Sequence, residues 1–161
     1  MIELHEMIKD EYEAFCKLTL ADHVRELTEV EGKTPEEAKR QALEEFNEVL
    51  PDGLDTPENF VMLIKSDGVD VGYIWTYHEL CDGKKQSFIC DFLIYEAQRR
   101  NGYGAEALRV MEEKARNAGC VESVLFVEDK NARAIRLYEK CGYVFLRKME
   151  YGMYMKKVIS A

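Results

Sequence analysis

Apolar residues in the first third of the chain recur at steps of three and four, a spacing that places them on one face of an α-helix. The pattern predicts one helix over residues 10–31 and a second over residues 35–50. Thr34 marks the start of the second helix, because its hydroxyl can cap the first turn and Glu37 stands where a capping box needs a carboxylate. A weakly alternating segment at residues 2–8 predicts a short strand before both helices.

After Pro57 the pattern changes to the alternation that is typical of strands. Asp-Gly turns at residues 67–68 and 82–83 divide the next stretch into three strands joined by hairpins. A polar loop and a Gly-Tyr-Gly segment then begin a third helix. The predicted elements are strands 60–66, 69–80 and 86–95, a helix ending near 118, strand 121–127, helix 131–140, and strands 143–149 and 151–158.

The predicted order of elements is βααβββαβαββ. A strand, a loop, a helix and a strand in the middle of this order imply one parallel crossover within a mostly antiparallel sheet. The sequence therefore predicts an α/β (α+β) fold with a mixed sheet. A length of 161 residues and an apolar fraction of 47% are typical of one globular domain.

Charge is distributed unevenly along the chain. The formal net charge of −9 argues against nucleic acid as a partner, because a phosphate-rich polymer requires a basic surface. Residues 1–60 carry 17 acidic and 6 basic side chains, whereas residues 61–161 carry 14 and 16. The acidic part is either a solvated helical face or a rim that attracts a cationic small molecule or peptide.

Several classes of protein are not expected from this sequence. Its apolar runs are strand-sized and do not approach the roughly 20 residues of a membrane span, so we expect no membrane partner. The N-terminal segment has acids where a secretion signal needs basic and apolar residues, so we expect a cytoplasmic protein. The five cysteines are scattered without a C-x-x-C pair, so we expect reduced thiols and no metal site.

The segment between the third hairpin strand and the third helix reads Arg99-Arg100-Asn101-Gly102-Tyr103-Gly104. Its glycines let the backbone approach a ligand closely, and the start of the helix offers unpaired N–H groups and the positive end of the helix dipole. The two arginines add positive charge suited to phosphate. The segment is either a phosphate or pyrophosphate site or a plain strand-to-helix turn with solvated arginines.

A dinucleotide site is an alternative for the same segment. Gly102-x-Gly104-x-x-Ala107 fits the dinucleotide fingerprint, and Glu128 follows about 20 residues later, where a ribose-binding acid belongs. However, six polar or small residues separate Tyr95 from the first glycine, and hairpins rather than helices join the preceding strands. Both features argue against a NAD-type fold.

A second segment, in the predicted helix 131–140, complements the glycine loop. Residues of this helix and of the turn after it match the pattern Asn…Ala-x-x-Leu-Tyr-x-x-x-Gly-Phe, with Tyr in place of Phe, at Asn131, Ala134, Leu137, Tyr138, Gly142 and Tyr143. Arg99-x-x-Gly102-x-Gly104 matches the pattern Arg/Gln-x-x-Gly-x-Gly/Ala. With both motifs in this order, the chain resembles the GNAT superfamily of N-acetyltransferases, which use acetyl-coenzyme A.

The resemblance covers nearly the whole chain and implies the GNAT fold, with helices on both faces of the sheet. It implies a single acetyltransferase domain, 1–161. In that domain, residues 1–58 would form the acceptor-side strand and helices, and residues 59–161 the acetyl-coenzyme A-binding core and C-terminal hairpin.

The resemblance also implies a set of cofactor-binding residues. The fourth strand would pair with the pantetheine chain and place one N–H near the thioester oxygen, and the loop amides would hold the pyrophosphate. Asn131 would contact the pantetheine or nearby backbone, although it also suits a helix N-cap. The implied set is Phe92, Leu93, Ile94, Arg99, Arg100, Asn101, Gly102, Tyr103, Gly104, Asn131 and Ala134.

Two residues are candidates for proton transfer. Tyr138 would protonate the leaving thiolate, since a phenol keeps its proton at pH 7, although a core aromatic is the alternative. Asp91 would accept the proton of the amine, and a structural aspartate is its alternative. Phe88 and Cys90 carry no carboxylate where other family members have Glu, which keeps a water relay open.

The expected activity is direct transfer of an acetyl group from acetyl-coenzyme A to a primary amine of a small molecule or peptide. Acetylation of protein N-termini or lysines, and a non-catalytic acyl-coenzyme A sensor, are the alternatives. Apolar residues on the closing strands suit either a homodimer contact or ordinary alternation at a sheet edge.

Overall fold

The computed structural model describes residues 1–160, and the chain folds as two compact units. One unit is Met7–Asn59, and the other joins Met1–Glu6 to the described residues from Phe60 onward. The predicted element order is confirmed, with two short 3₁₀ helices added at Gly53–Asp55 and Glu96–Gln98. No helix among residues 1–160 is both long enough and apolar enough to cross a membrane.

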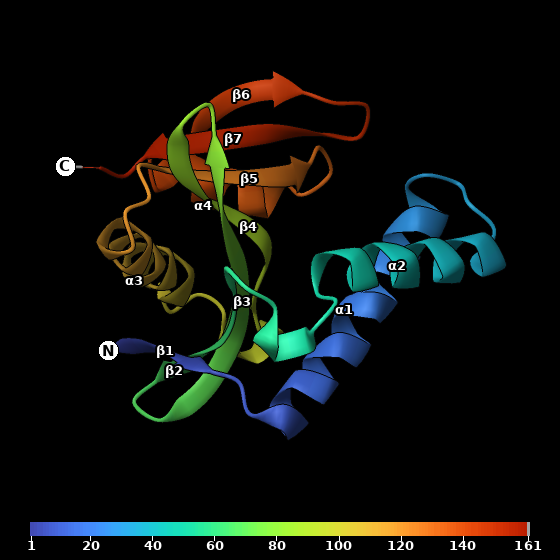
Figure 1. Ribbon diagram of the computed structural model, residues 1–161, viewed down its shortest axis with the longest axis horizontal. Coiled ribbons are helices and arrows are strands. Elements are labelled where there is room, and N and C mark those ends of the chain that lie inside the picture. The colour runs from blue at the N-terminus through green and yellow to red at the C-terminus, as the bar shows by residue number, and fades with distance from the viewer. Residues whose placement is uncertain (161) are drawn as a thin grey trace. The chain divides into compact units, whose positions relative to one another are not determined.

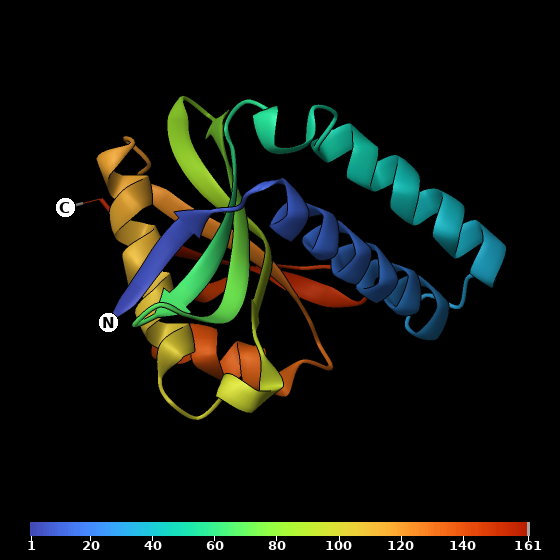
Figure 2. The same ribbon diagram turned by 90° about the horizontal axis from the view of Figure 1, so that it is seen from below.

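The smaller unit is a helical hairpin. Helices α1 (Lys9–Glu29) and α2 (Pro35–Val49) run side by side, as Figure 2 shows. Their contact is built on Leu27, Ala38 and Ala42, and the small alanine side chains let the helices approach closely.

Both helices of the hairpin are capped by side chains close to their starts. The hydroxyl of Thr34 accepts a hydrogen bond from the Glu37 amide at 3.3 Å, so the predicted N-cap of α2 is confirmed. At α1, the amide of Ile8 donates to the Glu11 carboxylate at 2.9 Å. Each bond satisfies a backbone group that the helix itself leaves unpaired.

His23 joins the two helices through its imidazole ring. Its Nε2 lies 2.5 Å from Glu45 Oε2 on α2, and its Nδ1 lies 3.6 Å from Glu26 Oε2 on α1. The hydrogen bonds with Glu26 and Glu45 raise the pKa of His23 to about 9, although burial acts in the opposite direction. The ring is therefore a cation at pH 7 and holds the helix pair together.

The stability of the protein should fall as the pH rises from 6.5 to about 9. The folded-state pKa of His23 is raised, so its contribution is complete below the unfolded-state value of 6.5 and is lost as the pH passes about 9. Because the pair is partly exposed and screened, we expect a loss of about 1 kcal/mol. Urea unfolding of the wild type and His23→Gln between pH 6 and pH 10 tests this, and parallel pH profiles for both proteins would contradict it.

The larger unit is a seven-stranded sheet with the order β1-β2-β3-β4-β5-β7-β6 (Figure 1). β4 and β5 pair in parallel, as the predicted crossover requires, whereas β1–β2, β3–β4, β5–β7 and β6–β7 pair antiparallel. The expected mixed, mostly antiparallel sheet is confirmed. The strands are β1 (Ile2–Glu6), β2 (Asn59–Ser66), β3 (Val69–Cys81), β4 (Lys84–Ile94), β5 (Glu122–Glu128), β6 (Val144–Lys148) and β7 (Gly152–Val158).

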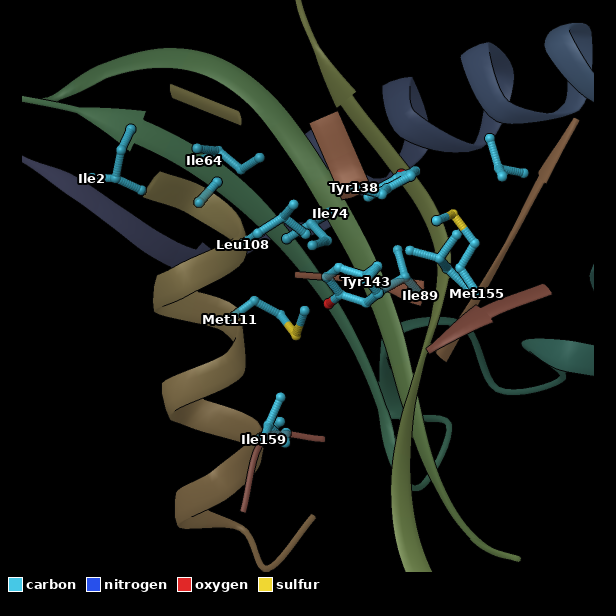
Figure 3. Packing of buried hydrophobic residues seen from close by; sticks show 14 of the residues in the cluster. Ile2, Ile64, Ile74, Ile89, Leu108, Met111, Tyr138, Tyr143, Met155 and Ile159 are labelled. Carbon is cyan, nitrogen blue, oxygen red and sulfur yellow. The ribbon is translucent and has the colours of Figure 1, made fainter. Parts of the chain in front are cut away.

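Helices α3 (Tyr103–Asn117) and α4 (Ala132–Lys140) cover one face of this sheet. Figure 3 shows Leu108 and Met111 of α3 pointing toward strand residues that include Ile74. The same cluster contains Ile89, Leu125 and Met155 from the central strands and Tyr138 from α4. Burial of these side chains orients the loop that precedes α3 and the first turn of α4 at the end of β4.

Strand β4 has two irregularities near its C-terminal end. Trp75 pairs with Asp91 but the next residue, Thr76, pairs with Ile89, so Cys90 is the extra residue of a β-bulge. The parallel pairing of β4 with β5 ends at Ile89 and Leu125 in the described part of the chain. Beyond this point the two strands do not pair in the described part of the chain, so the end of β4 at residues 92–94 can present peptide groups to a ligand.

Candidate active site

The loop after β4 is shaped by side-chain hydrogen bonds and by two left-handed residues. Arg99 Nε donates to the last carbonyl of β4 at 2.9 Å, and Asn101 Nδ2 donates to a carbonyl within the loop at 3.0 Å. Arg100 and Gly102 have φ angles of 68° and 75°. Glycine adopts this conformation at little cost, whereas an arginine there is held by its surroundings.

Gly104 lies in the first turn of α3 and packs against α4. A Cβ added at this position would lie 3.1 Å from Leu137 Cδ2, closer than ordinary contacts allow. The absence of a side chain therefore brings the two motifs of the sequence together. The first N–H groups of α3, which have no partner within the helix, lie beside this contact and favour an anion.

A cavity of about 290 Å³ lies between the end of β4, the loop, α3 and α4. Most residues that the family resemblance implies for cofactor binding line it, although they come from three separate segments. They are Phe92, Leu93, Ile94, Arg99, Arg100, Gly102, Tyr103, Gly104, Asn131 and Ala134, and Tyr138 lines the same cavity.

Sequence reasoning missed several residues of this lining. Arg133 and Lys140 add positive charge to the wall formed by α4, and they are seven residues apart, so they share a helical face. The seven-residue spacing of these two basic side chains could have been recognised in the sequence. The remaining residues of the lining are Gln98, Ala105 and Leu137.

Three predicted residues have structural contacts of their own. Asn101 is not part of the cavity lining, because its amide is bonded inside the loop. Asn131 lines the cavity and also accepts a hydrogen bond from the Ala134 amide at 3.2 Å, so its interpretation as an N-cap is confirmed. Asp91 lies outside the lining, and its Oδ2 accepts a hydrogen bond from the Tyr73 hydroxyl at 3.0 Å.

Tyr138 is buried on the sheet-facing side of α4 and also lines the cavity. Its ring meets that of Tyr143 edge-on, with ring centroids 5.7 Å apart (Figure 3). Burial raises the pKa of Tyr138 well above 10, and the nearby charges of Asp91 and Cys141 act in the same direction. The phenol therefore keeps its proton throughout the neutral and mildly alkaline range and can donate it.

Tyr143 stands where the Gly-Phe motif has phenylalanine, and its contacts explain this difference. Its hydroxyl lies 2.7 Å from Ser123 Oγ and donates to Glu112 Oε2 at 3.1 Å. Glu112, which is 4% exposed, also accepts a hydrogen bond from Lys157 Nζ at 2.7 Å. The extra hydroxyl thus belongs to a buried network under the site, which a phenylalanine could not join.

The thiols near the site are not poised for nucleophilic attack. Burial raises the pKa of Cys90 and of Cys141, so both thiols are protonated at pH 7. Within residues 1–160, no three His, Cys, Asp or Glu side chains gather in a way that could hold a metal ion.

Comparisons with known proteins agree with this geometry. The sequence model described as "Acetyltransferase (GNAT) family" matches residues 12–143. Two uncharacterized N-acetyltransferases of Bacillus subtilis (strain 168) are similar to the chain. YycN is 31% identical over 143 residues, which are 88% of this chain and 92% of YycN. YdgE is 30% identical over 141 residues, which are 87% of this chain and 90% of YdgE.

Solved structures are similar as well. The crystal structure of YycN from Bacillus subtilis superposes with a TM-score of 0.87 at 28% identity and covers 93% of this chain and 96% of that chain. Spermidine N-acetyltransferase from Vibrio cholerae, solved in complex with CoA and spermine, has a TM-score of 0.69 at 13% identity. This second likeness covers 98% of this chain and 95% of that chain and shows the fold alone.

Proposed function

Because the chain belongs to the GNAT family and is an N-acetyltransferase, we propose that it transfers the acetyl group of acetyl-coenzyme A to a primary amine of a small molecule or peptide. One observation carries the proposal. A single cavity brings together an anion-favouring loop, an unpaired strand edge and a buried, protonated tyrosine. These three parts match the pyrophosphate, the pantetheine chain and the leaving thiolate of one cosubstrate.

The chemistry of the cavity fits coenzyme A along its length. The loop amides and the N-terminus of α3 suit the pyrophosphate, and Arg99 and Arg100 add charge beside them. Phe92, Leu93 and Ile94 would pair through their backbones with the two amides of the pantetheine chain. Support comes from the Vibrio cholerae enzyme of the same fold, whose structure contains CoA.

The proposed reaction is direct attack without an acyl-enzyme intermediate. The amine nitrogen first forms a bond to the acetyl carbon, and the carbon–sulfur bond then breaks. A backbone N–H of β4, at residues 92–94, stabilises the oxyanion that forms between these events. Tyr138 gives its proton to the departing thiolate, and Asp91 receives the proton of the amine, directly or through a water molecule. The protonated state of Cys90 supports the absence of a thiol nucleophile.

The hydrogen bond from Tyr73 supports the role of Asp91. The hydroxyl of Tyr73 holds the carboxylate of Asp91 in one orientation, as a positioned proton acceptor requires. The β-bulge at Cys90 changes the alternation of β4 next to Asp91, which places this side chain on the same face of the sheet as Trp75. Asp91 would therefore act from the side of the sheet that α3 and α4 do not cover.

Thermal unfolding with acetyl-coenzyme A, coenzyme A, NAD or buffer alone tests the cosubstrate. Coenzyme A at 100 times its dissociation constant should add about 2.7 kcal/mol to the free energy of unfolding, and NAD should add nothing. A screen of primary amines, read by product mass because free thiols interfere with thiol reagents, then tests transfer. The absence of any shift with coenzyme A would contradict the proposed cosubstrate.

A further inference from the structure

The position of the cavity determines which way the acceptor must approach. The cavity lies on the face covered by α3 and α4, and it reaches β4 where the pairing with β5 ends. We call the space between β4 and β5 beyond Ile89 and Leu125 the gap, and the face of the sheet that α3 and α4 do not cover the second face. In the proposed reaction the pantetheine chain fills the side of the cavity. The amine must therefore reach the thioester through the gap from the second face. The residues on that face beside the gap are therefore in a position to select the acceptor.

An aromatic row crosses the second face beside the gap. Strand alternation places Phe88, Phe126 and Tyr154 opposite to the core residues Ile89, Leu125 and Met155. Neighbouring ring centroids lie 5.4 Å apart for Tyr77 and Phe88, 6.3 Å for Phe88 and Tyr154, and 5.2 Å for Phe126 and Tyr154. We call these four residues, Tyr77, Phe88, Phe126 and Tyr154, the aromatic row.

Phe126 is the member of the row that stands nearest to the gap along the chain. It follows Leu125, the last residue of β5 that pairs with β4, and its side chain is 40% exposed. A large exposed aromatic ring on a central strand is unusual, because such strands normally bury their aromatic residues. With the neighbouring rings of the row it forms an apolar patch that suits contact with a ligand.

Carboxylates accompany the aromatic row on the second face. Glu79 follows Tyr77 by two residues on β3 and is held by a hydrogen bond from Gln86 Nε2 at 2.9 Å. Asp91 directly follows the bulge, and Glu79 pairs with Gln86 farther along the same face. Together with the negative faces of the rings, they favour a cation on this face of the sheet.

Two basic residues on this face have partners of their own. Arg147 lies over the Tyr154 ring, 5.0 Å from its centroid, at the outer strand of the sheet. This contact demonstrates that a ring of the row presents its face to a cation. Lys156, the other basic residue of this part of β7, lies 3.9 Å from Glu122 and is balanced by it.

We propose that the aromatic row is the acceptor site and that the acceptor carries a second positive charge besides the reacting amine. The inference rests on the proposed acetyl transfer and adds the class of the acceptor to it. One ammonium group loses its proton and attacks through the gap, while the second lies against the ring of Phe126. An anionic group at that end would be repelled by the negative face of the ring.

Three amines of matched length test the second charge. They are 1,5-diaminopentane, pentylamine and 5-aminopentanoate, which share the reacting group and differ only at the far end. We expect kcat/KM to fall in that order, with the diamine at least tenfold better than pentylamine, as one cation–π contact of about 1–2 kcal/mol permits. Equal rates, a preference for 5-aminopentanoate, or acetylation of none of the three while coenzyme A still binds would overturn the inference.

A pair of phenylalanine variants tests the site. Phe126→Leu should raise KM for the diamine about tenfold and leave the thermal shift with coenzyme A unchanged, since the ring lies outside the cofactor cavity. Phe145→Leu is the matched control. Phe145 is also exposed, but it lies on the outer strand β6. Its register partner is the core residue Met155, so its side chain points to the face that α3 and α4 cover.

The outcomes of the paired experiment separate the two proposals. Equal KM values for Phe126→Leu and Phe145→Leu would reject the aromatic row as the acceptor site. The absence of a thermal shift with coenzyme A in the wild type would instead reject the proposed function itself. A normal shift in Phe126→Leu also establishes that the variant is folded.

Discussion

Replacement of Tyr138 by phenylalanine should lower kcat by about 100-fold and leave the affinity for coenzyme A unchanged. General acid catalysis is worth about 100-fold or more, and the variant loses only the hydroxyl that supplies the proton. The ring that packs edge-on against Tyr143 is retained, so the wall of the cavity keeps its shape. Steady-state kinetics with a primary amine, together with the thermal shift produced by coenzyme A, measure the two quantities separately.

Tyr143→Phe is the control for this experiment. It removes a hydroxyl from the neighbouring buried ring, whose oxygen is bonded to Ser123 and Glu112 and which does not line the cavity. We expect this variant to lose about 1–2 kcal/mol of stability and to keep its kcat. An unchanged kcat for Tyr138→Phe, or an equal loss in both variants, would show that Tyr138 is not the acid.

Replacement of Lys157 by methionine should lower the free energy of unfolding by about 3 kcal/mol. The ammonium group of Lys157 lies 2.7 Å from a carboxylate oxygen of Glu112, whose side chain is only 5% exposed. Without the lysine, the carboxylate remains buried and, within residues 1–160, keeps only the hydrogen bond from the Tyr143 hydroxyl described above. A buried charge that loses its counter-ion costs far more than a surface pair is worth. Urea unfolding at pH 7 measures the loss.

The adjacent residue supplies a matched control. Lys156 lies 3.9 Å from Glu122, and both side chains are more exposed than the Lys157–Glu112 pair. Lys156→Met should therefore cost less than about 1 kcal/mol. Adding Glu112→Gln to Lys157→Met should recover part of the loss, because the substitution removes the buried charge. Equal costs for the two single lysine variants would contradict the proposed importance of the network.

Local patterns were enough to predict the elements of the fold. The N-cap at Thr34 and the Asp-Gly turns at residues 67–68 and 82–83 act over a few residues, so the sequence around each one contains all the necessary information. The two motifs were recognisable for the same reason. Each is a short segment whose residue types are dictated by its own loop or helix.

Several features of the site could not be predicted in this way. The bulge at Cys90 depends on the register between β3 and β4, and the gap after Ile89 depends on where β5 leaves β4. The partner of Asp91 is Tyr73, which lies on the neighbouring strand and carries no local signal of that contact. Pairings of this kind join residues that are distant along the chain.

The sequence by itself therefore determined the order of elements, the family and the two segments that would meet a cosubstrate. Only the tertiary structure decided that those segments share one cavity, where Gly104 packs against Leu137. It also decided that Phe126 stands on the second face, exposed beside the gap. The physical reason is that local conformation follows from neighbouring residues, whereas a site forms where packing brings distant segments within contact of one another.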